Sequence, residues 1–487
     1  MISTSFSEKY SQVFPLGNLY TNTFELFTQR RKNHLQQLDS FAVFSAVPQI
    51  PGEENPWFLN SARIIQEPAF LFLTGINQPG PILLLNPFGQ HKEILFLPKK
   101  KSNKEFWHGV TFGYPSSKDG TNNKDLILLS KWTGISNIQP LSSFSSTITQ
   151  IINSSKKKWG YCFFHQYNAE SLPAKRPLSI KKDHNWKFYK RVKKLTHKII
   201  QKSSKSKNNF IIKSIAALHH NLRLPVEDRQ LKCMHKAIQF TNTAFKNCIM
   251  RLPTFQNEHQ VKSYLEYQLQ KQSVYGLSFP TITASGKNAL ILHYLKNDES
   301  LNHHHLILLD FGLRYGELQT DISRTVPLSG IFNPLQRLLY QIVLNAQMEN
   351  EKNARSGITI RQLNKIVWTY LEKELEKKFF SKGGKAKRSY VNQPHGVSHL
   401  LGLQVHDGDP FRLYQDIPLQ KGWMISNEPG LYGYFCMTIN GKKYKEHIGI
   451  RIEDNLLIQS KGCLNLSQCI PKNIIEIENL MKKVSHR

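Results

Sequence analysis

Short apolar segments alternate with polar turns in the first part of the chain. Four of these segments read FAVFSA, FLFLTG, PILLLNP and EILFLP, at 41–46, 70–75, 81–87 and 93–98, and Gly, Pro and Asn separate them. Apolar runs bounded by turn residues are typical of strands. The basic segment FTQRRKNHLQQL at 27–38 precedes them, and we interpret it as a helix. The pattern predicts a mixed α/β domain at the amino-terminal end.

The second half of the chain contains segments with apolar residues at helical spacing. They cover 226–249, 258–272, 333–354 and 359–378. Acidic residues begin the first of them, as a helix amino terminus favours. A chain of 487 residues also exceeds the size of one hydrophobic core. We therefore expect an α+β protein with domains at 1–180 and 216–487, joined by a basic linker helix at 181–215.

Basic residues accumulate between about 155 and 213, where acidic residues almost vanish. The amphipathic segment from Asp183 to Lys202 predicts a solvated helix in this linker. The formal net charge of the whole chain is +30, which is compatible with a nucleic-acid or anionic-membrane partner. Lysine and asparagine are abundant along the entire chain, however, and no DNA- or RNA-binding motif accompanies them. We expect no specific nucleic-acid binding.

Several classes of protein do not fit this sequence. The first thirty residues lack the apolar core of a secretory signal. No window approaches eighteen consecutive apolar residues, so we expect no membrane span. The six cysteines form no CxxC pair, which argues against a zinc ribbon or a disulfide scaffold. We expect reduced thiols and a cytoplasmic protein.

Two aspartates follow the apolar run LILL in LILLDFGLRYGELQTDISRTVPLSG at 306–330. If Tyr315 and Gly316 form a two-residue hairpin turn, Asp310 lies directly opposite Asp321. The Cβ atoms of such cross-strand partners are roughly 4.5–5.5 Å apart on one face of the hairpin. Two facing carboxylates repel each other unless a cation lies between them. The hairpin therefore predicts a metal site.

Three histidines lie close together in PHGVSHLLGLQVHDGD at 394–409, namely His395, His399 and His406. A single histidine here would fit a satisfied core residue. Three of them with intervening glycines indicate the wall of a site, because neutral imidazole binds transition metals and exchanges protons near neutral pH. Gly396 and Val397 disfavour a helix between the first two histidines, so we expect only one of that pair to bind metal.

Two glutamates complete the candidate set. Glu428 precedes a Pro-Gly turn that follows an apolar strand in KGWMISNEPGLYGY. Strict alternation in HIGIRIEDNLLI places isoleucines on one face of a strand and Arg451 with Glu453 on the other. A carboxylate beside an arginine on such a face is better explained by metal binding than by chance exposure.

These residues carry a resemblance to a known family. Asp310, Asp321, His399, Glu428 and Glu453 stand in the order and context of the five metal ligands of the pita-bread metallopeptidases. That family includes methionine aminopeptidase, prolidase and aminopeptidase P, and the resemblance covers about 222–475. It implies a pita-bread catalytic domain at the carboxy-terminal end.

Within this family the chain most resembles aminopeptidase P. The segments DISRT, ILHY, EPGLY and GIRIED carry that resemblance, and so do RR at 30–31, FLFLTGINQPGPILLL and FWHG in front of them. An amino-terminal α/β domain of the aminopeptidase P type is therefore implied. His293, His395 and His406 match positions that shape the substrate site of the family.

The resemblance also implies a mechanism. Two divalent ions, most often manganese, would be bridged by Asp321 and Glu453, with Asp310 on one ion and His399 and Glu428 on the other. A hydroxide bridging the two ions would attack the carbonyl of the residue that precedes proline. The implied enzyme is a Xaa-Pro aminopeptidase that acts on peptides with proline in second place and forms a homo-dimer or homo-tetramer.

The resemblance assigns roles to the remaining residues. Glu428 would move a proton to or from the attacking water. His395 and His406 would hold the substrate carbonyl and the tetrahedral intermediate, and His293 would bind substrate at the same place. Arg451 would steady Glu453.

The chain departs from the family pattern at Leu318, where an aromatic residue is common, and at Leu400, where tryptophan is common. Both residues remain apolar, so they affect the shape of the substrate site rather than the chemistry. The segment SKGGKAKRS at 381–389 is interpreted as a surface loop, and the three histidines at 303–305 as an exposed turn.

Two alternatives remain. The first is prolidase, which cleaves only Xaa-Pro dipeptides with the same metals; DISRT favours the aminopeptidase. The second is a non-catalytic basic pita-bread protein that binds nucleic acid, against which the complete set of metal ligands argues.

Overall fold

The computed structural model describes residues 13–14, 16, 19, 22–46, 66–100, 110–115, 124–155, 157, 159–162, 211–273, 275–408 and 414–482. The chain divides into two compact units, Met1–Arg223 and Leu224–Arg487, so the division falls eight residues after the expected one at 215/216. The predicted helix from Asp183 to Lys202 and the FWHG segment at 106–109 lie outside the described residues. Within those residues, every helix is too short or too polar to cross a membrane.

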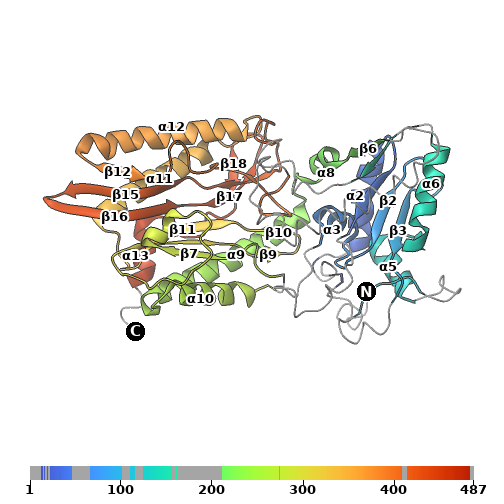
Figure 1. Cartoon of the computed structure of the whole chain (residues 1–487), viewed down its shortest axis with the longest axis horizontal. Helices are drawn as coiled ribbons and strands as arrows, with labels where there is room; N and C mark the ends of the chain where they lie inside the picture. Colours follow the sequence, from blue (N-terminus) through green and yellow to red (C-terminus); the bar gives the residue numbers. More distant parts are fainter. Residues whose placement is uncertain are drawn as a thin grey trace, which may run out of the picture. The chain divides into compact units, whose positions relative to one another are not determined.

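Unit 1 is built on a mixed sheet with the strand order β4-β3-β2-β1-β5-β6 (Figure 1). The strands are β1 (Ala42–Ser45), β2 (Ile82–Leu85), β3 (Glu93–Leu97), β4 (Ile138–Pro140), β5 (Trp159–Cys162) and β6 (Ile211–Ser214). Strand β2 runs antiparallel to β1 and β3, and the other pairs are parallel. The strands expected at 41–46, 81–87 and 93–98 are confirmed. Strand β6 takes four residues that we expected in the linker helix, because they extend the sheet.

Helices accompany this sheet. They are α2 (Thr23–Gln37), α3 (Pro68–Thr74), α5 (Lys124–Thr133), α6 (Phe144–Ser154) and α8 (Ala216–Arg223). Buried side chains of α6, including Phe144 and Ile148, pack on Phe41, Val43 and Phe96 from the sheet. The helix expected at 27–38 is confirmed as α2.

The strand predicted at 70–75 is wrong, because FLFLTG forms most of α3. The Glu67 side chain caps this helix by accepting a hydrogen bond from the Phe70 backbone N–H, at 2.8 Å. Pro68 stands in the first turn, and Gly75 ends the helix with φ of 73°. An apolar run this short does not distinguish a buried helix from a buried strand, whereas the residues that flank it do.

The Arg-Arg pair of α2 holds that helix against α3. Arg30 donates to the Phe72 carbonyl at 2.9 Å, and Arg31 donates to the Leu73 carbonyl at 3.0 Å. These carbonyls belong to the last turn of α3, where backbone acceptors have no partner within the helix. Arg31 also forms an ion pair with Glu93 on β3 at 3.0 Å. The two buried arginines therefore join two helices and the sheet.

The four helices predicted in the second half are confirmed in Unit 2. They are α9 (Asp228–Arg251), α10 (Glu258–Gln270), α11 (Pro334–Asn353) and α12 (Ile360–Lys378), and α13 (Ile474–Lys482) follows near the end. Capping boxes begin α9, α11 and α12, with Glu227, Asn333 and Thr359 as the caps. Each box satisfies backbone donors at the helix start, which fixes where the helix begins.

The strands of Unit 2 form small antiparallel sheets. They are β7 (Ile282–Ser285), β8 (Leu306–Phe311), β9 (Arg314–Tyr315), β10 (Leu318–Gln319), β11 (Ile322–Pro327), β12 (Lys385–Arg388), β13 (Leu400–Leu401), β14 (Met424–Asn427), β15 (Gly430–Ile439), β16 (Lys442–Arg451), β17 (Asp454–Ile458) and β18 (Cys463–Asn465). The larger sheets have the orders β11-β8-β7, β12-β15-β16 and β13-β14-β17-β18. In the view of Figure 1, α11 and α12 lie on one side of these strands and α9 and α10 on the other.

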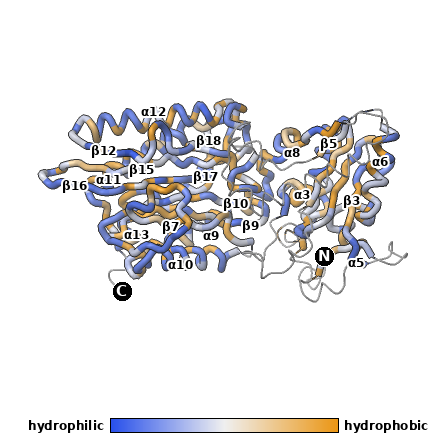
Figure 2. The backbone as a smooth tube through the Cα atoms, viewed as in Figure 1, coloured by the Kyte–Doolittle hydropathy of each residue, from blue (hydrophilic) through white to orange (hydrophobic). Residues whose placement is uncertain are grey.

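The strands of Unit 2 contain many apolar residues, as the colouring of Figure 2 shows, while α12 has hydrophilic residues along much of its length. The core beneath α12 joins Ile360 and Leu363 of the helix to Leu400, Ile425 and Leu456 of three strands. The surface loop expected at 381–389 is wrong in its centre, because Lys385–Arg388 pairs with β15 as strand β12. The turn expected at 303–305 is found, and His303 and His304 are exposed.

Candidate active site

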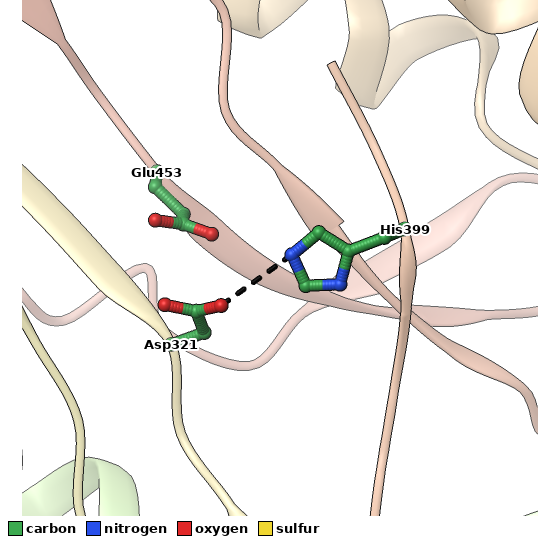
Figure 3. Close-up of side chains that lie close together, drawn as sticks. All are labelled: Asp321, His399 and Glu453. Carbon is green, nitrogen blue, oxygen red and sulfur yellow. Dashed lines mark ion pairs between the residues drawn. The ribbon is translucent and has the colours of Figure 1, made fainter. Parts of the chain in front are cut away.

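Three predicted metal ligands, Asp321, His399 and Glu453, face one another in the interior of Unit 2 (Figure 3). One ligand atom from each lies within 4.8 Å of the others, and all three residues are buried. Asp321 immediately precedes β11, His399 immediately precedes β13, and Glu453 lies in the short connection between β16 and β17. Segments that are far apart in the sequence therefore place their donor atoms around one small volume.

The register of the hairpin differs from the prediction. Tyr315 pairs with Leu318, so Gly316 and Glu317 form the turn, and Asp310 lies opposite Ser323 rather than Asp321. Gly316 takes the first position of the turn with φ of 64°, as two-residue hairpins favour. Tyr315 stays in the strand, where its ring packs against Phe240 and Tyr275.

This shift of two residues preserves the face on which the aspartates lie. Side chains alternate along a strand, so a shift by one residue would have turned one carboxylate away, whereas a shift by two does not. Asp321 becomes a diagonal neighbour of Asp310, still within reach on the same face. The predicted pairing is wrong, and the predicted proximity of the two carboxylates does not depend on it.

Glu428 and His399 lie side by side. The His399 Nε2 atom is 3.3 Å from Glu428 Oε1 and 3.4 Å from Asp321 Oδ2. The His399 Nδ1 atom contacts the Leu400 carbonyl at 3.0 Å, which turns Nε2 toward the carboxylates. Burial lowers the pKa of His399, but its hydrogen bonds with Asp321 and Glu428 outweigh burial and raise that pKa well above the usual value.

Two buried carboxylate oxygens of the site fit a bound cation. In the described part of the chain, Asp310 Oδ1 and Glu453 Oε1 are buried and have no hydrogen-bond partner. Burial, together with the neighbouring carboxylates, raises the pKa of Asp321 to about 6 and that of Glu453 well above the usual value. Buried acceptors without donors are costly, and a divalent ion bound by them would remove that cost. The donor set of carboxylates with one imidazole fits such an ion.

Arg451 contacts Asp310 directly and Glu453 indirectly. Its Nη2 donates to Asp310 Oδ2 at 2.5 Å, and its Nε donates to Ser323 Oγ at 2.8 Å. Ser323 Oγ in turn donates to Glu453 Oε2 at 2.8 Å. The arginine was expected to steady Glu453, and in this structure it reaches that carboxylate through Ser323.

The three histidines assigned to the substrate site lie at different depths. His395 is within 3.6 Å of Glu428, and the His406 ring is 4.4 Å from the His399 ring. Burial, helped by the nearby charge of His399, lowers the pKa of His406 to about 3, so this ring is neutral at physiological pH. His293 is exposed and lies within electrostatic reach of His406.

Sequence reasoning missed several residues that hold this site together. The Tyr432 hydroxyl contacts His395 Nε2 at 2.9 Å and accepts from Arg451 Nη1 at 3.2 Å. The Asn455 side chain accepts from the Asp321 N–H and donates to the Asp321 carbonyl, at 3.2 and 2.6 Å. Tyr432 belongs to the same EPGLY segment as Glu428. This closeness in the sequence is the signal that could have identified it.

Arg324 holds the backbone of the segment that carries Glu453. Its guanidinium is fully buried and donates to the Glu453 carbonyl at 2.5 Å and to Asp454 Oδ1 at 2.7 Å. It also donates to the carbonyls of Ile470 and Pro471. The arginine of the DISRT segment therefore fixes the backbone at the point where the chain passes from β16 to β17.

Comparisons with known proteins identify both units. Residues 232–460 match the family described as metallopeptidase family M24, and residues 27–159 match the aminopeptidase P N-terminal domain. The chain is 26% identical over 467 residues to the mitochondrial intermediate cleaving peptidase 55 of Arabidopsis thaliana, with 95% of this chain and 84% of that protein covered. It is also 26% identical over 465 residues to the Xaa-Pro aminopeptidase of Haemophilus influenzae, with 94% and 97% covered.

Solved structures share this fold. A structure of a putative aminopeptidase P from Bacillus anthracis superimposes with a TM-score of 0.71 at 26% identity and covers 94% of this chain and 98% of its own. Aminopeptidase P from Escherichia coli, solved with the inhibitor Pro-Leu, gives a TM-score of 0.73 at 22% identity, with 95% and 99% covered. The predicted fold class, α+β with a pita-bread domain behind an aminopeptidase P-type domain, is confirmed. Residues 232–460 form a domain of metallopeptidase family M24, which follows an aminopeptidase P N-terminal domain in the chain, and the fold is that of an aminopeptidase P.

Proposed function

We propose that this metallopeptidase releases the first residue from peptides with proline in second place. The observation that carries the proposal is the buried cluster of Asp321, His399 and Glu453, with Asp310 on the neighbouring strand β8. One oxygen of Asp310 and one of Glu453 have no hydrogen-bond partner among the described residues. The likeness to Xaa-Pro aminopeptidases over both units supports the choice of substrate.

We propose that the cluster holds two divalent ions, with Asp310, Asp321, His399, Glu428 and Glu453 as the ligands. The donors fit this role because three carboxylates and one imidazole face the same space, and the Asp310 carboxylate lies on the neighbouring strand β8. Carboxylate-rich sites suit manganese, which remains our choice of metal. Ions bound here would supply a nucleophile from water at neutral pH and would offset the negative charge that develops on the substrate carbonyl oxygen.

The protein's own groups then handle protons and orient the substrate. Glu428 lies between His399 and His395, and its hydrogen bond with His399 together with the nearby positive charges outweighs burial and lowers its pKa to about 2. The carboxylate is therefore ionised at neutral pH, which is the form that binds a metal ion and the form that a proton acceptor needs. His395 is held by the Gly396 carbonyl and the Tyr432 hydroxyl beside Glu428, where its ring can contact the substrate, and neutral His406 offers a second polar contact.

Proline in second place needs a dedicated site. An Xaa-Pro bond has no amide proton and a fixed ring, so a strand-like contact to the substrate backbone cannot recognise it. Side chains around the site must make the contacts instead, and His293, His395 and His406 are the polar groups available for this.

We also propose a cytoplasmic homo-oligomer, a dimer or a tetramer. The six cysteines all lie among the described residues and form no disulfide, which supports a reducing compartment. Size-exclusion chromatography with light scattering tests the assembly, and a monomeric mass would contradict it.

A second candidate activity comes from the relatives. The Arabidopsis protein is named an intermediate cleaving peptidase and is similar over 95% of this chain. That name does not mention proline, so we take aminopeptidase activity that does not require proline in second place as the competing function. Prolidase activity on Xaa-Pro dipeptides is the third possibility.

One assay separates these activities. Hydrolysis of Xaa-Pro-Yaa, Xaa-Ala-Yaa and the dipeptide Xaa-Pro is measured side by side with added manganese. Preferred cleavage of Xaa-Pro-Yaa supports the proposal, preferred cleavage of Xaa-Ala-Yaa supports the competing function, and cleavage of the dipeptide alone indicates prolidase.

A further inference from the structure

Glu258 is a completely buried carboxylate on which several donors converge. It is the first residue of α10 and has no exposed surface. Its Oε1 accepts from the Ser285 N–H at 2.7 Å, from Ser285 Oγ at 2.9 Å and from Asn288 Nδ2 at 3.1 Å. Its Oε2 accepts from the Tyr294 hydroxyl at 2.8 Å and from the Glu299 N–H at 3.1 Å. None of these five donors is a cation, so the carboxylate serves a polypeptide segment rather than a charge partner.

That segment is the loop between β7 and β8, and Glu258 holds both of its sides. Ser285 ends β7, Asn288 lies in the short 3₁₀ helix η7 (Gly286–Leu290), and Tyr294 and Glu299 lie on the returning side. The backbone repeats the connection, because the Glu258 N–H donates to the Glu299 carbonyl at 2.9 Å. One carboxylate therefore closes this loop at several points, and such a closure limits the positions open to the residues between them.

The closed loop is seated against the active site. Ala289 and Tyr294 belong to the same buried cluster as Tyr432, the residue that contacts His395. Gly449 on β16 lies so close to the loop that a Cβ there would stand 2.2 Å from the Ala289 carbonyl oxygen. The loop can therefore rest directly on the strand that leads to Arg451.

His293 is the residue that this loop presents. It immediately precedes Tyr294, whose hydroxyl is fixed by Glu258, and its own side chain is exposed. Its backbone neighbour Tyr294 packs in the same buried cluster as Tyr432, which contacts His395. A series of contacts therefore runs from Glu258 through Tyr294 and Tyr432 to His395, which lies 3.6 Å from Glu428.

We infer that Glu258 is a positioning residue for the reaction and acts by holding His293 where it meets the substrate. This inference rests on the proposed function. A carboxylate is needed because all five partners donate; an amide of the same shape would turn an NH₂ group toward at least one backbone N–H. Misplacement of a substrate-positioning group by about 1 Å can cost on the order of 100-fold in rate.

A double-mutant cycle tests the inference with Xaa-Pro-Yaa as the substrate. Glu258→Gln should lower kcat/KM by about 10- to 100-fold. In a His293→Ala background the same change should cost no more than about twofold, because the residue through which Glu258 acts is already gone. The control is Glu266→Gln on the same helix, whose carboxylate pairs with Lys262 near the surface; it should leave kcat/KM unchanged. Losses that multiply in the double variant would overturn the inference.

A milder variant covers the case in which Glu258→Gln fails to fold. Tyr294→Phe removes only the hydroxyl that donates to Glu258, and its loss of activity should also disappear in the His293→Ala background. Equal losses with and without His293 would again contradict the role of Glu258.

Hydrogen exchange separates a failure of this inference from a failure of the proposed function. Without any substrate, Glu258→Gln should speed amide exchange across 285–299 and leave β8 and β11 unchanged. Unchanged exchange across 285–299 would overturn the inference even if the wild type cleaves the tripeptide. If the wild type cleaves none of the Xaa-Pro substrates, the proposed function is refuted. The positioning role of Glu258 in that reaction is then refuted as well, whatever the exchange result.

Discussion

Ser323 connects Arg451 to Glu453 through its hydroxyl. Removal of this hydroxyl should weaken metal binding although every proposed metal ligand is kept. The hydroxyl accepts from Arg451 Nε and donates to Glu453 Oε2, each at 2.8 Å, and Ser323 is fully buried. Ser323→Ala leaves the arginine Nε–H without its acceptor and the glutamate without its donor. Nothing else needs to move, because alanine is smaller than serine.

The expected magnitude follows from the two contacts. Each hydrogen bond involves a charged group, and such bonds contribute about 1.5–3 kcal/mol each. Loss of a residue that orients a metal ligand typically costs 10- to 100-fold in metal affinity, which is about 1.4–2.7 kcal/mol. We therefore expect metal affinity to fall by about 10- to 100-fold, and the free energy of unfolding of the metal-free protein to fall by a few kcal/mol.

The assay is a titration of the metal-free protein with Mn²⁺ in competition with a chelator, followed by activity at saturating metal. The matched control is Ser329→Ala, which removes an exposed hydroxyl that donates only to the nearby Ile331 carbonyl. Lower metal affinity in Ser323→Ala, with activity largely restored at saturating metal, supports the contact network. Wild-type metal affinity combined with a lower melting temperature would refute it, because Ser323 would then serve the fold alone.

Three further predictions address stability. Removal of metal with a chelator should lower Tm and re-addition should restore it, since an ion present at 100 times its Kd stabilises the folded state by about 2.7 kcal/mol; an unchanged Tm would contradict metal binding in the folded state. Burial lowers the pKa of His34 to about 4, so its stabilising effect is complete above pH 6.5 and is lost as the pH falls toward 4, by about 3 kcal/mol. Thermal unfolding of wild type and His34→Gln from pH 7.5 to 4.5 measures this difference, and equal pH dependence of the two would contradict it. Gly75→Ala should destabilise the protein by more than about 1 kcal/mol, because Gly75 has φ of 73° and a Cβ would stand 2.5 Å from the Phe27 ring; chemical denaturation measures this, and a stability equal to the wild type would contradict it.

The helices of Unit 2 could be predicted well because local signals agree with the packing. Apolar spacing marks their buried faces, and Glu227, Asn333 and Thr359 cap their first turns. Shorter elements were less predictable. The run at 70–75 is apolar throughout and has no period, so only Pro68 and Gly75 at its ends distinguish the helix from a strand.

Register and long-range contacts were the least predictable features. Gly316 favours a turn, but the sequence does not determine whether it takes the first or the second position of that turn. In the structure it takes the first position, so the residue opposite Asp310 is Ser323 and not Asp321. Lys385–Arg388 has the composition of an exposed loop and becomes a strand because β15 offers an edge to pair with. Local sequence does not encode such a partner.

The candidate site was recognised through the resemblance of its five ligands to a known family, and the residues around it were not. Ser323, Arg324, Tyr432 and Asn455 contact residues that are 19 to 134 positions away in the sequence. Hydroxyls and amides of this kind are common in any chain, and only the folded arrangement shows which of them support a metal ligand.

The most direct test compares the hydrolysis of Xaa-Pro-Yaa, with and without added Mn²⁺, by the wild type, Asp321→Asn and Asp416→Asn. Asp416 is an exposed aspartate paired with Arg361, so its substitution controls for the loss of one charge. We predict metal-dependent release of the first residue by the wild type and by Asp416→Asn, and loss of both bound metal and cleavage in Asp321→Asn. Full cleavage by Asp321→Asn, or cleavage by the wild type that continues after its metal has been removed, would contradict a metal-dependent aminopeptidase site at this cluster.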